Sequence, residues 1–213
     1  MVYLPAQYEM QDPERIRELV ASNPLATLVT LGTDGLVANH IPMLFDDNRG
    51  EHGTLVGHVA RNNVLWREGF HDGESLAIFQ GIDAYISPNW YASKQETHEV
   101  VPTWNYAVVH AWGPLVIHND VKWVRGLVGR LTKVMETAQP VPWRMGQAPP
   151  AYLEEMLANI VRIELPITRL VAKWKVSQNR TAEDRASAAA GLRAAGTPDA
   201  MAMADLVEFS SDS

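Results

Sequence analysis

The stretch Val101-Pro102-Thr103-Trp104-Asn105-Tyr106 continues as Ala107-Val108-Val109-His110-Ala111-Trp112 and stops at Gly113-Pro114. It favours a β-strand, because aromatic and β-branched residues are enriched in strands and Gly and Pro end them. Its first half crowds two aromatic rings, a hydroxyl and an amide together, where an ordinary buried strand carries aliphatic side chains. A flat ligand with a polar edge suits such a segment, and a ladder of aromatic pairs across two strands would look similar. Both interpretations stay open for this run by itself.

The sequence on either side predicts a fold built mainly from short strands. Strands are expected at 25–31, 36–45, 54–59, 76–79, 101–112, 115–118, 160–165 and 170–176. Helices are expected at 13–22, 63–68, 120–136, 152–158, 182–194 and 198–207. Gly32-Thr33-Asp34-Gly35 is a hairpin signal between the first two strands. Antiparallel strands joined by hairpins, with most helices late in the chain, indicate a mainly β, α+β fold with a small barrel.

The same patterns predict one domain over residues 1–209, with C-terminal helices from about residue 181 and a frayed tail at 210–213. No apolar run approaches the roughly 18 to 20 residues of a membrane span, and the first residues lack a targeting pattern. The chain contains no cysteine, which excludes disulfides, thiolate metal sites and cysteine nucleophiles. We therefore expect a cytoplasmic protein without membrane contact.

The formal net charge of −7 and the pI near 5.5 count against non-specific nucleic-acid binding. The two C-terminal helices superficially suggest a helix-turn-helix, but the second carries Asp199, Asp205 and Glu208. A recognition helix that faces phosphates should not be acidic. We therefore expect no direct DNA binding, and we interpret this helix pair as a packing or dimer element.

Common catalytic motifs are absent from the sequence. It has no glycine-rich phosphate loop, no His-x-x-x-His pair and no Gly-x-Ser-x-Gly element. Classical dinucleotide binding, a histidine metal site and a serine hydrolase triad therefore have no support. No catalytic residue can be assigned, and we expect no metal.

Two segments in the first third of the chain suit a ligand. In Asn39-His40-Ile41-Pro42 the proline has no N–H, so it leaves part of one strand edge unpaired. In Gly57-His58-Val59-Ala60-Arg61-Asn62-Asn63 a strand passes into a helix that opens with Arg and Asn, a reasonable phosphate site. A plain edge strand and a surface ion pair of Arg61 are the alternatives.

A third segment is Lys173-Trp174-Lys175-Val176-Ser177-Gln178-Asn179-Arg180. On a strand, Lys173 and Lys175 share one face and repel each other, unless an anion lies between them or both are solvated. Trp174 points the other way, either into the core or over a ligand ring.

Taken in order, these segments resemble the PaiB family of FMN-binding negative transcriptional regulators. The matching stretches are Tyr3-Leu4-Pro5, Asn39-His40-Ile41-Pro42, Gly57-His58-Val59-Ala60-Arg61, Ala84-Tyr85-Ile86-Ser87-Pro88 with Trp90-Tyr91, Val101 to Tyr106, and Lys173 to Arg180. The chain departs from the family at Asn62-Asn63-Val64, where Ala-Asn-Pro is usual, at Arg162, where a glycine is expected, and at Tyr8, where Phe is usual. The missing proline after Asn63 weakens the phosphate site slightly.

The resemblance implies a flavin reductase-like split β-barrel that forms a homodimer, with FMN in each of two clefts between the subunits. It implies that the strand from Asn39 to Met43, with His40 and Ile41 within it, offers backbone groups to the isoalloxazine edge. His58, Arg61 and Asn62 would face the ribityl phosphate, and Asn105, with its neighbours Thr103 and Trp104, would lie near the polar side of the ring. The residues implied for the partner subunit are Lys173, Trp174, Ser177 and Gln178. Weaker candidates, in a mobile loop, are Tyr91 and Lys94.

Two other functions remain open on the sequence. The chain could be an NAD(P)H-dependent flavin reductase or oxidase of the split-barrel type, or a haem-binding split barrel with a histidine as axial ligand. A homodimer is expected in each case, because a split barrel leaves one face of its cleft open and the seven Trp residues can cover apolar surface. The residues identify no substrate, electron donor or DNA target.

Overall fold

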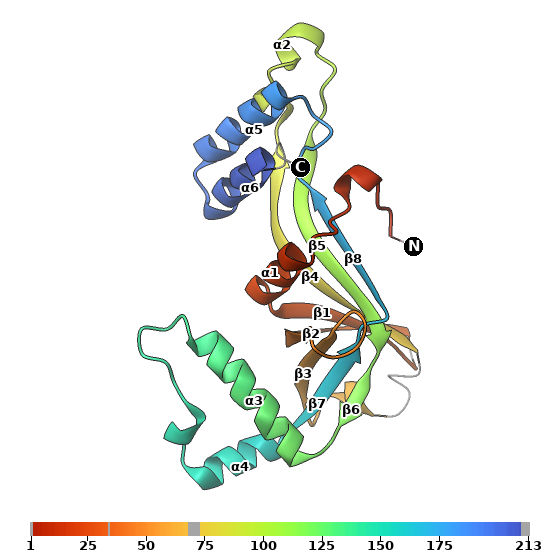
Figure 1. Cartoon of the computed structure of the whole chain (residues 1–213), viewed down its shortest axis with the longest axis vertical. Helices are drawn as coiled ribbons and strands as arrows, with labels where there is room; N and C mark the ends of the chain where they lie inside the picture. The colour runs from red at the N-terminus through yellow and green to blue at the C-terminus, as the bar shows by residue number, and fades with distance from the viewer. Residues whose placement is uncertain (1, 34, 68–72, 210–213) are drawn as a thin grey trace. The chain divides into compact units, whose positions relative to one another are not determined.

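A computed structural model describes residues 2–33, 35–67 and 73–209 (Figure 1). Its strands are β1 (Leu25–Gly32), β2 (Gly35–Asp46), β3 (Thr54–Ala60), β4 (Glu74–Ile86), β5 (Thr103–Pro114), β6 (Val116–His118), β7 (Ile160–Pro166) and β8 (Arg169–Lys175). They form a sheet in the order β6-β7-β3-β2-β1-β4-β5-β8. The α-helices are α1 (Pro13–Ser22), α2 (Lys94–Thr97), α3 (Val121–Glu136), α4 (Pro150–Ala158), α5 (Ala182–Ala195) and α6 (Pro198–Phe209). Short 3₁₀ turns are η1 (Ala6–Tyr8), η2 (Val64–Trp66), η3 (Pro88–Trp90) and η4 (Met145–Gln147).

Local sequence signals account for most of these boundaries. Asp12 caps α1, since its Oδ1 accepts from the backbone N–H of Glu14 at 2.9 Å, and Pro13 is the first helical residue. Asp120 caps α3 in the same way through the N–H of Lys122, at 2.7 Å. The predicted hairpin is confirmed by the pairing of Gly32 with Gly35. Asp34 in its turn, Glu68 and the predicted tail at 210–213 lie outside the described residues.

Two predictions about single elements were wrong, and α2 was not predicted. The strand expected to end at residue 79 continues to Ile86, although Gly81 and Asp83 are residue types that are depleted in strands. A Cβ on Gly81 would lie only 3.3 Å from the carbonyl oxygen of Ala107, so glycine permits a close approach to that backbone. The helix expected at 63–68 is only the three-residue turn η2 in its described part.

The chain divides into two compact units. The terminal unit comprises Met1–Leu19, Gln80–Val109 and Val171–Ser213, and the central unit comprises Val20–Phe79 and His110–Leu170. In the central unit, β6, β7, β3, β2 and β1 pair antiparallel in that order. Helix α3 packs against β7 and β3, where Leu127 and Leu131 bury Val56 together with Leu44 (Figure 1). This apolar contact holds the amino-terminal turn of α3 beside the ends of these strands.

In the terminal unit, α5 and α6 pack against each other. Their buried faces consist of small or flexible apolar side chains: Ala188, Ala189, Leu192, Ala200, Met203, Ala204 and Val207. The ring of Trp90 fills the space where Gly191 has no side chain. None of the described helices is both long enough and apolar enough to cross a membrane.

Candidate functional site

Strand β2 changes its hydrogen-bonding partner at Pro42. Residues 35–42 pair with β1, whereas pairing with β3 covers only residues 43–46. The N–H of Met43 donates to the carbonyl oxygen of Pro24, just before β1, at 2.8 Å, so the backbone groups of Met43 face the β1 edge. Successive residues of a strand direct their backbone groups to opposite edges. The backbone groups of Ile41 therefore face β1, and those of His40 and Pro42 face the other edge. This second edge has no β3 partner before Met43, so the predicted unpaired edge is present.

Two buried nitrogens beside this edge lack hydrogen-bond partners among the described residues. Asn39 Oδ1 accepts from Asn63 Nδ2 at 2.9 Å, but Asn39 Nδ2 has no acceptor. His58 Nδ1 is also buried without a partner, and burial lowers the pKa of His58, which favours the neutral imidazole. Buried polar groups are normally satisfied in folded proteins. A flavin ring has carbonyl oxygens and ring nitrogens along one edge, so these residues fit such a ligand.

Arg61 is committed largely to the protein itself. Its Nε donates to Ala158 O at 2.6 Å and its Nη2 to Ile160 O at 3.3 Å, while its backbone N–H donates to Asn159 O at 2.8 Å. The guanidinium also lies 5.6 Å from the ring centre of Trp66. Arg61 thus ties the end of β3 to the connection between α4 and β7, and its Nη1 makes no hydrogen bond to the described residues. Among the described residues, the contacts of Arg61 are with carbonyl oxygens and with the ring of Trp66, and none of them is an ion pair.

The turn after Arg61 offers little of the helix N-terminus that the sequence suggested. In η2, Asn63 already caps the backbone N–H of Leu65 through its side chain, at 2.9 Å. Asn62 is exposed and remains available to a ligand. A phosphate here would rest on side chains, because the free amide groups expected from a longer helix are missing.

The terminal unit brings together a second set of predicted residues. Asn105 is buried and donates from Nδ2 to Ser177 Oγ at 2.9 Å. Ser177 has a backbone φ of 69°, a left-handed conformation that is uncommon for serine. Gln178 supports this turn by accepting from Val176 N at 2.8 Å and donating to Trp174 O at 2.6 Å. Trp174 is buried, as the core interpretation expects, and its contact with a ligand ring stays a prediction.

Both lysines of this segment meet neutral groups. Lys173 Nζ donates to Tyr3 O at 3.2 Å and lies 5.5 Å and 5.3 Å from the ring centres of Tyr3 and Tyr106. Lys175 Nζ donates to Thr103 Oγ1 and to Trp104 O, each at 2.5 Å. In the described part of the chain, neither forms an ion pair with a carboxylate. Burial, and then the charges of Lys173 and Arg180, lower the pKa of Lys175.

Of the remaining predicted residues of this unit, Tyr91 and Lys94 are joined by a hydrogen bond from Lys94 N to Tyr91 O at 3.2 Å. Trp104 is exposed and meets Tyr85 edge to face, with 5.9 Å between ring centres. Tyr91 is buried in the protein, with Arg180 over its ring at 4.4 Å, and its hydroxyl has no hydrogen-bond partner within residues 2–33, 35–67 and 73–209. Lys94 hydrogen-bonds Asn89 Oδ1.

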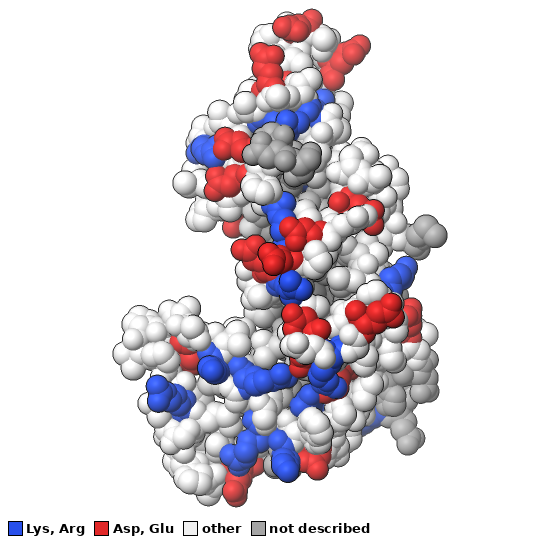
Figure 2. All heavy atoms as spheres, in the orientation of Figure 1, with Lys and Arg blue, Asp and Glu red and all other residues white. Residues whose placement is uncertain are grey.

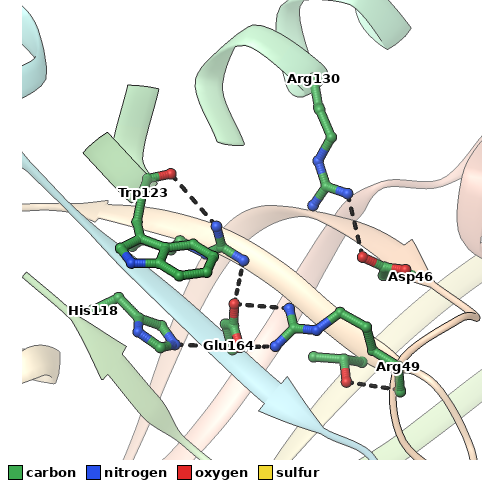
Figure 3. A network of polar contacts seen from close by, with 8 residues as sticks. Asp46, Arg49, His118, Trp123, Arg130 and Glu164 are labelled. Atoms are coloured by element: carbon green, nitrogen blue, oxygen red, sulfur yellow. Dashed lines mark hydrogen bonds and ion pairs between the residues drawn. The ribbon is translucent and has the colours of Figure 1, made fainter. Parts of the chain in front are cut away.

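Sequence reasoning missed a charged cluster in the central unit, which we call the Glu164 network (Figure 3). Glu164 is buried on β7 and accepts a two-fold hydrogen bond from Arg49, at 2.9 Å and 2.7 Å, and another from Arg162. His118 Nε2 lies 3.3 Å from Glu164 Oε2 without making a hydrogen bond. Although burial opposes ionisation, the hydrogen bond from Arg49 and the charges of Arg162, Arg49 and His118 lower the pKa of Glu164 to about 2. Two sequence signals pointed to it: the opposite charges that alternate with apolar residues in Ile160 to Leu165, and Arg162 at a position where the family resemblance leads one to expect a glycine.

Comparison with known proteins places the chain in a family. Residues 2–169 match the family described as "Putative FMN-binding domain". The chain belongs to this family. It is also 32% identical to "Protease synthase and sporulation protein PAI 2" of Bacillus subtilis over 208 residues, 97% of each chain. The predicted resemblance to the PaiB family is therefore confirmed, and FMN is the cofactor of the family.

Solved structures of low sequence identity share the fold. The flavocytochrome Anf3 of Azotobacter vinelandii aligns with a TM-score of 0.59 at 13% identity, over 82% of this chain and 70% of that one. An FAD and haem binding protein of Mycobacterium smegmatis aligns with a TM-score of 0.56 at 18% identity, over 79% and 73%. The predicted α+β split barrel is confirmed by these likenesses and by the sheet order.

Proposed function

We propose that the chain is a cytoplasmic protein that binds FMN at the interface of a homodimer. The observation that carries this proposal is the open edge of β2, where buried Asn39 Nδ2 and His58 Nδ1 have no hydrogen-bond partner among the described residues. Bound FMN supplies a carrier of electrons, and the protein supplies binding and orientation. The open edge suits a ring with acceptors and donors along one side.

Within the central unit, we assign the ring to the strand from Asn39 through His40 to Ile41. Backbone groups of His40 on the open edge and the amide of Asn39 would hydrogen-bond the polar edge of the ring. His58 is neutral and can donate or accept there. Arg61 and Asn62 would hold the phosphate, with the Nη1 atom of Arg61 as the group that its carbonyl partners leave unused.

The terminal unit would contribute from the partner subunit. Asn105 and Ser177 are hydrogen-bonded, so any site that uses both takes them from the same subunit. We therefore group Asn105 with Lys173, Lys175 and Ser177. In the part of the chain that the structure describes, the two lysines have neutral partners only, and their charge would attract an anionic flavin. A shared site also requires a homodimer, and sedimentation equilibrium that detects only monomer at micromolar concentration would contradict it.

Any regulatory role would proceed without direct DNA contact by α5 and α6. Arg193 on α5 pairs with Asp205 at 2.7 Å and with Glu208, so its charge is met by α6 itself. Helix α6 presents carboxylates, which phosphates repel. Strong, sequence-specific retardation of promoter fragments by the pure protein would overturn this part of the proposal.

The visible spectrum of the purified protein tests the cofactor. We expect the two absorption bands of a flavin, whereas a sharp Soret band would support haem, and bleaching by NADH would support a reductase. Substitution then tests the ring contacts. Asn39→Ala should lower the affinities for FMN and for riboflavin by the same factor, about tenfold, because Asn39 is assigned to the ring and not to the phosphate. Asn48→Ala, a matched change in an exposed loop, should leave both affinities unchanged. If Asn39→Ala and the wild type bound FMN and riboflavin equally well, the assignment of the ring to this edge would be contradicted.

A further inference from the structure

The central unit contains a pocket that the proposed flavin site does not use. Its volume is about 700 Å³, and it is lined by Asp46, Arg49, Lys122, Trp123, Gly126, Arg130 and Arg162. Four of these seven residues are cationic, in a chain whose formal net charge is −7. Figure 2 shows blue side chains gathered where α3 lies in Figure 1. We call this the α3 pocket.

Charges on the pocket wall do not balance. Arg130 Nη1 forms an ion pair with Asp46 at 3.2 Å, and Arg49 and Arg162 share Glu164 (Figure 3). Lys122 has no ion pair among the described residues. Four cations against two carboxylates leave a net charge of about +2, since Glu164 with its low pKa stays ionised.

One buried donor in the wall is unsatisfied. The side chain of Arg162 is only 6% exposed, and its Nη1 and Nη2 contact Trp123 O and Glu164. Its Nε is buried without any partner in the described structure. An unmet donor on a buried cation costs free energy unless a ligand or water accepts from it. The geometry of this wall therefore favours an acceptor that carries negative charge.

The α3 pocket is separate from the residues proposed for the flavin phosphate. Of the residues that line the pocket, Arg162 stands opposite His58 in the β3–β7 ladder, and Arg61 follows His58 by three residues and contacts Ile160 O. Three residues along a strand correspond to about 10 Å. A phosphate on Arg61 would not reach Lys122 and Arg130 through any contact that the structure contains.

We propose that the α3 pocket binds a small phosphate ester, with its phosphate held by Lys122 and Arg130 and attracted by the incompletely hydrogen-bonded guanidinium of Arg162. Arg guanidinium groups and Lys ammonium groups are the side chains that recognise phosphate, through forked and point-charge contacts respectively. Trp123 in the same wall gives the organic part of the ligand an aromatic surface. A pocket of this size encloses a small organic molecule, and an extended polymer would not fit inside it.

Calorimetric titration of the flavin-loaded protein with inorganic pyrophosphate and with ribose 5-phosphate tests the proposal. Both should bind saturably at millimolar concentration or below. The double variant Lys122→Gln/Arg130→Gln should bind each at least about tenfold more weakly. Arg125→Gln is the matched control, because Arg125 is an exposed cation on α3 that does not line the pocket. It should change both affinities less than about twofold.

A second variant tests the pocket by volume instead of charge. Gly126 lines the pocket, and a Cβ built on it meets no atom within 4 Å. Leucine also has a better helix propensity than glycine, so Gly126→Leu should fold. The added side chain should lower the affinity for ribose 5-phosphate at least about tenfold, and the affinity for the smaller pyrophosphate by less.

Three results would overturn the proposal: no saturable binding of either probe, equal losses in the control and the pocket variants, or displacement of the probes by a short DNA duplex. The flavin spectrum of every variant is recorded separately, so failure here is distinct from failure of the flavin proposal.

Discussion

Buried positive charge is stabilised differently in the two units. In the central unit, the buried guanidinium of Arg162 meets the carboxylate of Glu164. In the terminal unit, buried Lys173 meets two aromatic rings and a carbonyl oxygen, and Lys175 meets a hydroxyl and a carbonyl oxygen. Removing a partner from an ion pair leaves a charge unpaired, whereas removing a lysine that has only neutral partners leaves no opposite charge behind. The pair of Arg162 and Glu164 should therefore contribute strongly to the free energy of unfolding, whereas Lys173 and Lys175 should be available to bind a ligand.

Glu164→Gln should have the largest effect on stability. It leaves Arg162 buried without a counter-charge, which should lower the free energy of unfolding by about 3 to 5 kcal/mol. Urea denaturation measures the loss. Asp46→Asn is the matched control, because its partner Arg130 is 49% exposed, and it should cost less than about 1 kcal/mol. Equal losses in the two variants would show that burial does not distinguish these pairs.

Arg61→Ala tests an intermediate case, a central-unit cation whose partners are carbonyl oxygens. Loss of a charge-assisted contact worth roughly 1.5 to 3 kcal/mol should lower the affinity for FMN about ten- to hundredfold. Riboflavin lacks the phosphate, so its affinity should barely change. The variant should also lose about 1 kcal/mol of stability, because the carbonyl groups of Ala158 and Ile160 lose their donor. Equal losses for both ligands would mean a collapsed site and would withdraw the phosphate assignment.

Lys175→Met should separate binding from stability in the terminal unit. The ammonium has no carboxylate partner, so its removal should change the free energy of unfolding by less than about 1 kcal/mol. FMN affinity should fall about tenfold, because a charge near the flavin is lost. Lys133→Met removes an exposed lysine on α3 and serves as the control for net charge. A large loss of stability with unchanged FMN affinity would reverse the interpretation of the two units.

The pH dependence should also distinguish the units, with smaller effects. The pKa of Glu164 is lowered from 4.5 to about 2, so its contribution is fully present above pH 4.5 and is lost as pH falls toward 2. The stability difference between the wild type and Glu164→Gln should shrink across that window. The pKa of Lys175 lies below its usual 10.5, so the unfolded chain binds this proton more readily. Wild-type stability relative to Lys175→Met should therefore rise as pH approaches 10.5, and urea titrations at several pH values check both trends.

Short sequence patterns predicted those features of the fold that depend on residues close together in the chain. Asp12-Pro13 marks the start of α1, and Pro42 marks the change of partner in β2, because a cap and a missing N–H act within a few residues. The bond between Asn105 and Ser177 joins positions 72 residues apart, so their common placement required the fold. Arg49 and Glu164 are 115 residues apart, and each has the appearance of an ordinary surface charge in the sequence. The family resemblance suggested which segments carry the site, but not that Arg61 binds the protein's own carbonyl groups.

The open edge of β2 has a consequence for solubility when no ligand covers it. An exposed row of N–H and C=O groups is a template onto which a strand from another molecule can add, which is a common start of aggregation. Pro42 interrupts that row, because it offers no donor at the position where pairing with β3 ends. Pro42 therefore hinders a strand of another molecule from extending the hydrogen-bonded ladder. Pro42→Val should aggregate faster on heating than the wild type, and it should do so most in protein stripped of flavin.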